Sequence, residues 1–96
     1  MTPVILSNRA LTDLDEAAAY IARDDPEAAH RMIARLQDAA ANLGDVPNLG
    51  VALPQGGRRV FSVPGTPFRL VYRPAAKNIT ILRIWYGARG WPPVSS

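Results

Sequence analysis

The sequence predicts a single α+β domain in which an antiparallel sheet carries a helical hairpin packed on one face, in the order β-α-α-β-β-β. The chain has 96 residues, 48% of them hydrophobic and none of them Cys, which suits one small core without disulfides. Apolar residues recur at helical spacing in the first half, whereas the second half contains runs rich in β-branched and aromatic residues. We therefore expect residues 1–96 to form one domain.

The chain is expected to begin with a short strand and a helix. The apolar run Val4-Ile5-Leu6 predicts the strand, and the side chains of Ser7 and Asn8 offer acceptors for the free amides of a helix start. This helix should end near Arg23. Its expected apolar face consists of Leu11, Leu14, Ala18 and Ile21.

A second helix is expected after a tight turn. Asp25 can cap it, Pro26 has the fixed φ that suits the first helical position, and Glu27 places an acid in the opening turn. Gly44 is expected to end it. The expected apolar face consists of Ala29, Met32, Ile33, Leu36, Ala40 and Leu43.

The second half predicts three strands after a long connection. Residues 44–57 contain several Pro and Gly residues and show no periodic pattern, so they are expected to form a loop. Strands are expected at residues 59–63, 68–73 and 79–85. The turns between them are short and contain Pro, Gly and Asn, which predicts consecutive antiparallel hairpins.

Charge is divided unevenly along the chain. Residues 1–48 hold all eight acids and four arginines, whereas the rest of the chain has no acid and seven cations, namely Arg58, Arg59, Arg69, Arg73, Lys77, Arg83 and Arg89. These cations must meet either the acids of the first half or an external partner. An acidic protein or a polyanion is the partner that such a surface favours.

Several classes of chemistry are excluded by the residues present. The chain has no Cys, and its single His30 lies in a predicted helix, so neither a thiolate site nor a Ser-His-Asp arrangement is expected. Every acid lies on or beside the helices and is expected to be solvated. We expect no metal and no cofactor. No apolar run approaches the roughly 18 residues needed to span a bilayer, and the expected location is the cytoplasm.

What remains is a set of basic and aromatic residues in the second half. Arginine binds phosphates and carboxylates through its planar fork, and aromatic faces stack on bases. The set therefore suits contact with a nucleic acid or an acidic protein. A structural role is the alternative, because arginines also protect sheet edges and aromatic residues also fill cores.

Four segments of the sequence, together with their order, resemble the RelE/ParE superfamily of bacterial toxins. They are residues 20–29 (YIARDDPEAA), 43–50 (LGDVPNLG), 68–73 (FRLVYR) and 81–89 (ILRIWYGAR) followed by Trp91-Pro92. The resemblance implies the toxin of a type II toxin-antitoxin module, which arrests growth once it is released from its antitoxin. It also implies a RelE/ParE-like fold and a partly disordered antitoxin that wraps around the toxin and needs an uncompensated positive surface.

The superfamily contains two modes of action. RelE-like members cleave mRNA on the ribosome, and the resemblance would then give phosphate contacts to Arg59, Arg69 and Arg89 and proton transfer to Tyr86. The paired lysines of that pattern are missing, and no Glu or His follows Asp45. Arginine is a poor base, because its guanidinium group stays protonated far above neutral pH. ParE-like inhibition of DNA gyrase is therefore favoured, and the RelE-like nuclease is the alternative.

Partner binding is expected at Arg58, Arg73, Arg83 and Trp85, which carry charge and aromatic surface in the strands or beside them. The partners expected are the antitoxin and either DNA gyrase or the ribosome with its mRNA. A remote alternative is a basic binding module without toxicity, which the charge division alone would allow.

Overall fold

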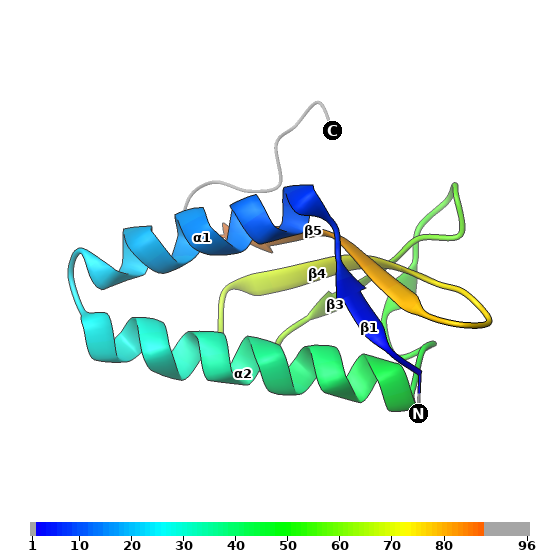
Figure 1. Ribbon diagram of the computed structural model, residues 1–96, viewed down its shortest axis with the longest axis horizontal. Helices are drawn as coiled ribbons and strands as arrows, with labels where there is room; N and C mark the ends of the chain where they lie inside the picture. Colours follow the sequence, from blue (N-terminus) through cyan, green and yellow to red (C-terminus); the bar gives the residue numbers. More distant parts are fainter. Residues whose placement is uncertain (1, 88–96) are drawn as a thin grey trace.

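The computed structural model describes residues 2–87, which form two helices and one mixed five-stranded sheet (Figure 1). The predicted α+β class and the predicted helical hairpin are confirmed. The elements are β1 Val4–Leu6, α1 Asn8–Ala22, α2 Pro26–Asp45, β2 Val51–Ala52, β3 Arg59–Ser62, β4 Phe68–Pro74 and β5 Ile79–Tyr86.

The sheet has the strand order β1-β5-β4-β3-β2. Strands β2 to β5 pair as consecutive antiparallel neighbours, whereas β1 lies parallel to β5. The expectation of a purely antiparallel sheet is therefore wrong at one edge. Both helices separate β1 from the other strands in the sequence, and this long crossover permits a parallel pair.

Local signals set the helix starts as predicted. The side chain of Ser7 accepts a hydrogen bond from the amide of Ala10 at 3.1 Å, and Asp25 accepts one from the amide of Ala28 at 3.1 Å. Each acceptor satisfies an amide that has no partner within its own helix.

Helix α2 continues through Gly44 to Asp45, so the expected end at Gly44 is wrong. A Cβ at Gly44 would lie 2.5 Å from the carbonyl oxygen of Thr2, and the amide of Thr2 donates to the carbonyl of Gly44 at 3.0 Å. Gly44 therefore serves the close approach of the chain before β1, and it does not terminate the helix.

The core lies between the helices and one face of the sheet. Its fully buried side chains include Leu36, Leu43, Phe68, Leu70, Tyr72, Ile79, Ile81 and Ile84. The expected apolar face of α1 is wrong at Leu11, which is 47% exposed. The buried residues of α1 are Ala10, Asp13, Ala17 and Ile21. The two alanines are small and let the helix pack closely on β5.

The expected loop 44–57 contains strand β2 and the tip of a β2–β3 hairpin. The amide of Leu53 donates to the carbonyl of Arg58 at 2.8 Å, and Gly56 and Gly57 have φ values of 74° and 64°. The left-handed conformation at the tip favours glycine and lets the chain reverse there. The hairpin projects beyond the sheet (Figure 1).

Neither helix of residues 2–87 is long and apolar enough to cross a membrane.

Candidate functional site

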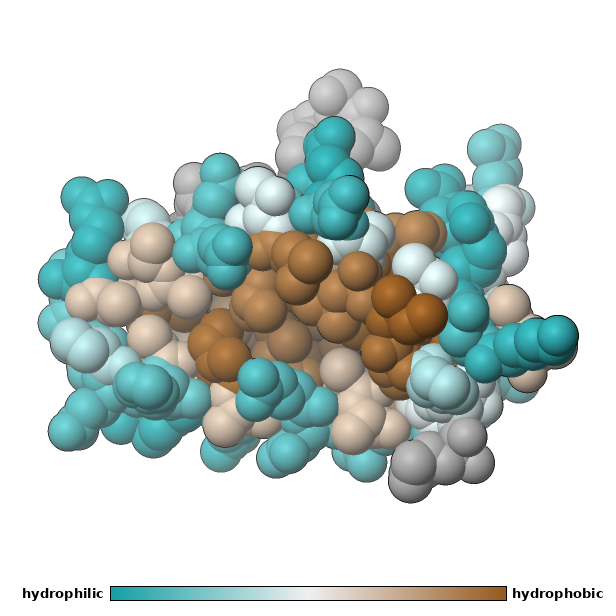
Figure 2. Space-filling model, in the orientation of Figure 1, coloured by the Kyte–Doolittle hydropathy of each residue, from teal (hydrophilic) through white to brown (hydrophobic). Residues whose placement is uncertain are grey.

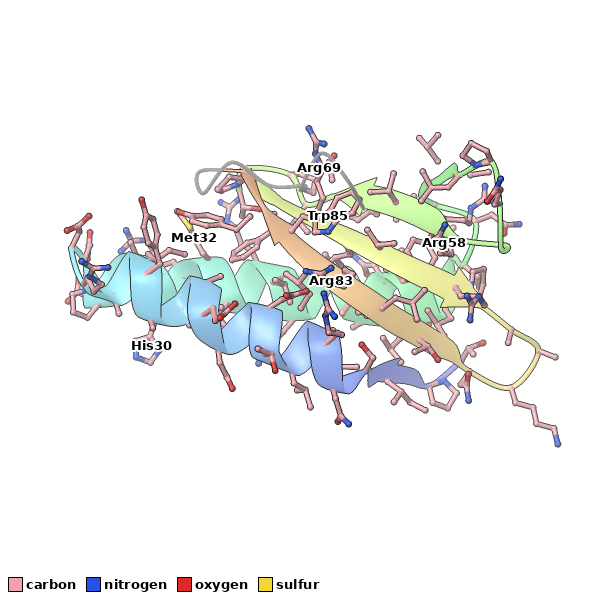
Figure 3. All side chains as sticks on the ribbon, turned by 90° about the horizontal axis from the view of Figure 1, so that it is seen from above. His30, Met32, Arg58, Arg69, Arg83 and Trp85 are labelled. Carbon is pink, nitrogen blue, oxygen red and sulfur yellow. The ribbon has the colours of Figure 1, made fainter. Side chains whose placement is uncertain are left out.

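The face of the sheet turned away from the helices carries basic and aromatic side chains. Along β4, exposed Arg69 and Arg73 alternate with core residues. The register pairs Arg69 with Trp85 and Val71 with Arg83, and directly opposite residues share one face of a sheet. We call this surface, formed by Arg69, Val71, Arg73, Arg83 and Trp85, the open face. Figure 3 shows Arg69 and Trp85 on the sheet side of the molecule and His30 on the far side of the helices.

A groove of about 550 Å³ crosses the open face. Leu53, Pro54 and Arg58 of the β2–β3 hairpin line it together with Arg9 of α1 and four residues of the strands, Val71, Leu82, Arg83 and Trp85. Among the described residues that line it, none is acidic. We call it the sheet groove. It brings together three of the four residues predicted to bind a partner, Arg58, Arg83 and Trp85.

Arg73, the fourth predicted partner-binding residue, holds the hairpin in place. Its Nε donates to the carbonyl of Gly56 at 3.0 Å, while Nε of Arg58 donates to the carbonyl of Gln55 at 3.4 Å. Both arginines therefore contact neutral carbonyl groups, and neither charge is neutralised by them. Leu53, Pro54 and Arg58, which lie on either side of this tip, line the groove, so Arg73 helps to position that lining.

Arg83 is paired within the chain. Its Nε lies 2.8 Å from Oδ2 of Asp13 and its Nη2 lies 3.2 Å from Oδ1, and this is the only ion pair within residues 2–87. The hydrogen bond from Arg83 to Asp13 is the main cause that raises the pKa of Arg83. The structure therefore gives Arg83 a structural role.

Asp13 is only 3% exposed, so the expectation that every acid is solvated is wrong. The position of Asp13 follows from the short β1, which pairs with β5 only as far as Ile81. Beyond that point Asp13 accepts a hydrogen bond from the amide of Ile84 at 2.9 Å. A carboxylate thus satisfies the edge of β5 where the neighbouring strand has ended.

The residues predicted for RNA cleavage do not converge in the described chain. Arg59 pairs in register with Tyr72 on the core side of the sheet, and its guanidinium donates to the carbonyls of Gly50 at 2.9 Å and Asn48 at 3.4 Å. Arg69 lies on the opposite face and has no hydrogen-bond partner within residues 2–87. Arg89 lies outside the described residues.

Tyr86, the predicted proton-transfer residue, belongs to the core. It is 6% exposed, and its ring centroid lies 5.2 Å from that of Phe68 and 5.9 Å from that of Tyr20. Burial is the main cause that raises the pKa of Tyr86, and the charge of Tyr20 adds to it. A raised pKa makes the phenol a weaker acid and keeps it protonated at neutral pH, so it cannot act there as a base.

Trp85 lines the sheet groove, and its indole nitrogen is buried. Its Nε1 is the only buried side-chain nitrogen or oxygen without a hydrogen-bond partner within residues 2–87. The sequence indicated an aromatic residue at position 85. It could not show that its indole N–H lacks an acceptor, because that depends on the residues packed around it. The hairpin residues Leu53 and Pro54 were also missed, although the Gly56-Gly57 pair is a known signal of a hairpin turn.

A second surface lies between the helices. Figure 2 shows an apolar band that runs along the hairpin, flanked by hydrophilic side chains. Two shallow grooves belong to it, one lined by residues that include Ala18, Ala22 and Ile33 and the other by residues that include Val4 and Leu6. Within residues 2–87, neither of these two grooves is lined by Arg or Lys, whereas the sheet groove is lined by three arginines.

Comparison with known proteins agrees with this architecture. Residues 4–91 match the family described as the ParE toxin of the type II toxin-antitoxin system parDE. The chain is 35% identical to toxin Y4kP of Sinorhizobium fredii over 90% of this chain and 88% of that protein. It is 36% identical to toxin RelE2 of Caulobacter vibrioides over 93% and 99% of the two chains.

A solved structure also has the same fold. It is described as the chromosomal ParDE TA system from P. aeruginosa and superposes with a TM-score of 0.72 at 29% identity. The match covers 88% of this chain and 94% of that chain. The family match over nearly the whole sequence, together with a helical hairpin on a cationic sheet, shows that this chain belongs to the ParE toxins of type II toxin-antitoxin systems, whose partner is an antitoxin protein.

Proposed function

We propose that the free toxin arrests growth by binding DNA gyrase, and that it acts by protein contact without chemistry of its own. This target would place its action in the cytoplasm. One observation carries the proposal, namely the separation of Tyr86 from Arg69. Tyr86 is buried on the helix side of the sheet, whereas Arg69 is exposed on the open face.

Cleavage of RNA through its 2′-hydroxyl needs a proton acceptor close to cations that bind the phosphate. The described part of the chain offers exposed cations, but its one predicted proton-transfer group faces the core. A surface of uncompensated arginines without a nearby base is suited to binding an acidic macromolecular surface. This arrangement supports contact as the mode of action and does not favour the RelE-like nuclease.

A supercoiling assay tests the proposal. Purified toxin is added to gyrase, relaxed plasmid and ATP, and the plasmid topology and the amount of cleaved DNA are measured on gels. We expect the toxin to block supercoiling or to trap cleaved DNA, and to leave the plasmid intact when gyrase is absent. Normal supercoiling at toxin concentrations well above those that stop growth would exclude gyrase as the target.

A pair of charge reversals tests whether the open face takes part. Arg69→Glu reverses an exposed charge on that face, and Lys77→Glu makes the same change in the turn between β4 and β5. We expect Arg69→Glu to raise the inhibitory concentration about tenfold and Lys77→Glu to change it less than about twofold, because only the first lies in the proposed contact. Equal effects would remove the open face from the gyrase contact.

A further inference from the structure

Strand β2 forms one edge of the sheet. Within residues 2–87 it pairs only with β3, so its outer side has no neighbouring strand. The amide of Leu53 donates to the carbonyl of Arg58, so these two residues form a hydrogen-bonded pair. Such pairs alternate with non-hydrogen-bonded pairs along an antiparallel ladder. Ala52 and Arg59 are the next pair, and the backbone N–H and C=O of Ala52 therefore point away from β3.

Ala52 is the residue of this edge that can exchange two hydrogen bonds with a further strand. Two residues earlier, the amide of Gly50 donates to the hydroxyl of Tyr72 at 2.8 Å, and its carbonyl accepts from Nε of Arg59 at 2.9 Å. Two residues later, Pro54 has no N–H to donate. A strand added to this edge must therefore centre its hydrogen bonds on Ala52.

The side chains along this edge are aliphatic and uncharged. Val51 is 71% exposed, and Val46 and Leu49, which precede it, are 50% and 44% exposed. Residues 46–57 are the longest stretch of the chain without a charged residue. Edge strands are commonly protected from pairing by charged side chains, and β2 carries none. An uncharged partner strand suits this edge better than an acidic or a basic one.

A second copy of the chain supplies such a strand. A two-fold axis that places Ala52 opposite Ala52 of the second copy lets each amide donate to the carbonyl across the axis. The same register places Val51 opposite Leu53 of the second copy, and Leu53 opposite its Val51, which gives two aliphatic cross-strand pairs. Each chain has a net charge of +3, and the two copies meet at a segment without charge.

We propose that the free toxin forms a weak dimer in which two β2 strands pair in antiparallel orientation about Ala52. The two sheets then continue as one. Val51 is in register with Val60, and Val60 with Val71 of the open face, so both open faces lie on the same side. The contact is small, which sets the dissociation constant on the order of 100 μM. The proposal concerns the free chain alone and does not depend on the gyrase target.

Cysteine cross-linking tests the register directly. The chain has no Cys, so every disulfide of a single-cysteine variant joins two chains. Opposite residues of a hydrogen-bonded pair have Cα atoms about 5.5 Å apart, which a disulfide can span. Toxin is separated from antitoxin in denaturant, refolded and oxidised with diamide. We expect Ala52→Cys to cross-link about tenfold faster than Ala76→Cys, which is exposed in the turn after β4. Equal rates would overturn the proposal.

Analytical ultracentrifugation measures the self-association itself. We expect the original chain to shift from monomer to dimer between about 10 μM and 1 mM, and Val51→Lys to stay monomeric because it places a charge at the contact. Leu11→Lys, which adds the same charge at a residue of α1 that is 47% exposed, is the matched control and should still dimerise. A chain that is monomeric throughout, or a dimer that persists in Val51→Lys, would contradict the proposal. Circular dichroism verifies that each variant is folded.

Hydrogen exchange at the amide of Ala52 distinguishes a second copy from a strand of the antitoxin. In the toxin alone, we expect this exchange to slow by about threefold or more as the toxin concentration rises through the same range. Slowing that requires antitoxin and does not respond to toxin concentration would assign the edge to the antitoxin, and the proposal would then be wrong.

Discussion

Tyr72 joins the sheet to the chain that follows α2 through one oxygen atom. Its hydroxyl donates to the carbonyl of Pro47 and accepts from the amide of Gly50, both at 2.8 Å. Only glycine fits at position 50, because a Cβ there would lie 2.7 Å from the carbonyl oxygen of Val60. The hairpin that lines the sheet groove begins directly after this anchor.

Removing the Tyr72 hydroxyl should destabilise the fold, because it removes the hydrogen bonds to Pro47 and Gly50. We expect Tyr72→Phe to lower the free energy of unfolding by about 1–3 kcal/mol, because the buried amide of Gly50 loses its acceptor. Urea denaturation followed by circular dichroism measures the change. Tyr86→Phe is the matched control at neutral pH, because its hydroxyl makes no hydrogen bond within residues 2–87. Equal losses for both variants would show that the two hydrogen bonds of Tyr72 add no stability beyond that of a hydroxyl without them.

Tyr86 should make the stability of the fold depend on alkaline pH. Its pKa is raised above the ordinary value of 10.0, so the folded chain holds this proton more tightly than the unfolded chain does. The resulting stability is fully present below pH 10 and is lost as the pH rises toward the higher pKa of the folded state. We expect Tyr86→Phe to lose less stability between pH 9 and pH 11, measured by urea denaturation at each pH. Identical pH profiles for both chains would contradict this.

At the scale of elements, the helices were predictable because their signals are local. Ser7, Asp25 and Pro26 each act within one helical turn, and the structure places both helix starts where these residues stand. The three later strands were also predicted, within one residue at each end, from their β-branched runs. Local patterns therefore identified six of the seven elements.

Features that depend on distant parts of the chain were not predictable. The parallel pairing of β1 with β5 and the position of Asp13 at the edge of β5 join residues about 70 or more positions apart. Strand β2 has only two residues and carries no pattern of its own. Among the site residues, the sequence indicated Arg58 and Trp85, but their common groove depends on the register of β4 with β5 and on the hairpin tip.

The cap of α2 offers a test at this scale. We expect Asp25→Ala to destabilise the fold by about 1 kcal/mol, because the amide of Ala28 loses its acceptor. Asp24→Ala removes the same charge one residue earlier, where the side chain makes no hydrogen bond within residues 2–87, and should have a clearly smaller effect. Thermal melting should show a loss of about 5 °C for the first variant. A larger loss for Asp24→Ala would mean that charge and not capping controls the helix start.

For the whole molecule, folding leaves the charges of the two halves largely unpaired with each other. Within residues 2–87, Asp13 and Arg83 form the only ion pair, so the other arginines of the open face keep their positive field. The helix side is different, because an apolar band runs between α1 and α2 (Figure 2). An uncompensated cationic face and an exposed apolar band both favour contact with another protein. These two faces agree with the mode of action proposed above, which is contact without catalysis.

Mapping RNA 5′ ends across the transcriptome tests this mode of action most directly. RNA is taken from cells within minutes of toxin induction, and the ends are compared with those from uninduced cells. We expect growth to stop while messages stay intact, because Tyr86 faces the core and the described open face offers cations without a base. New ends at fixed positions within codons that disappear in Arg69→Ala would contradict the account and identify a ribosome-dependent nuclease.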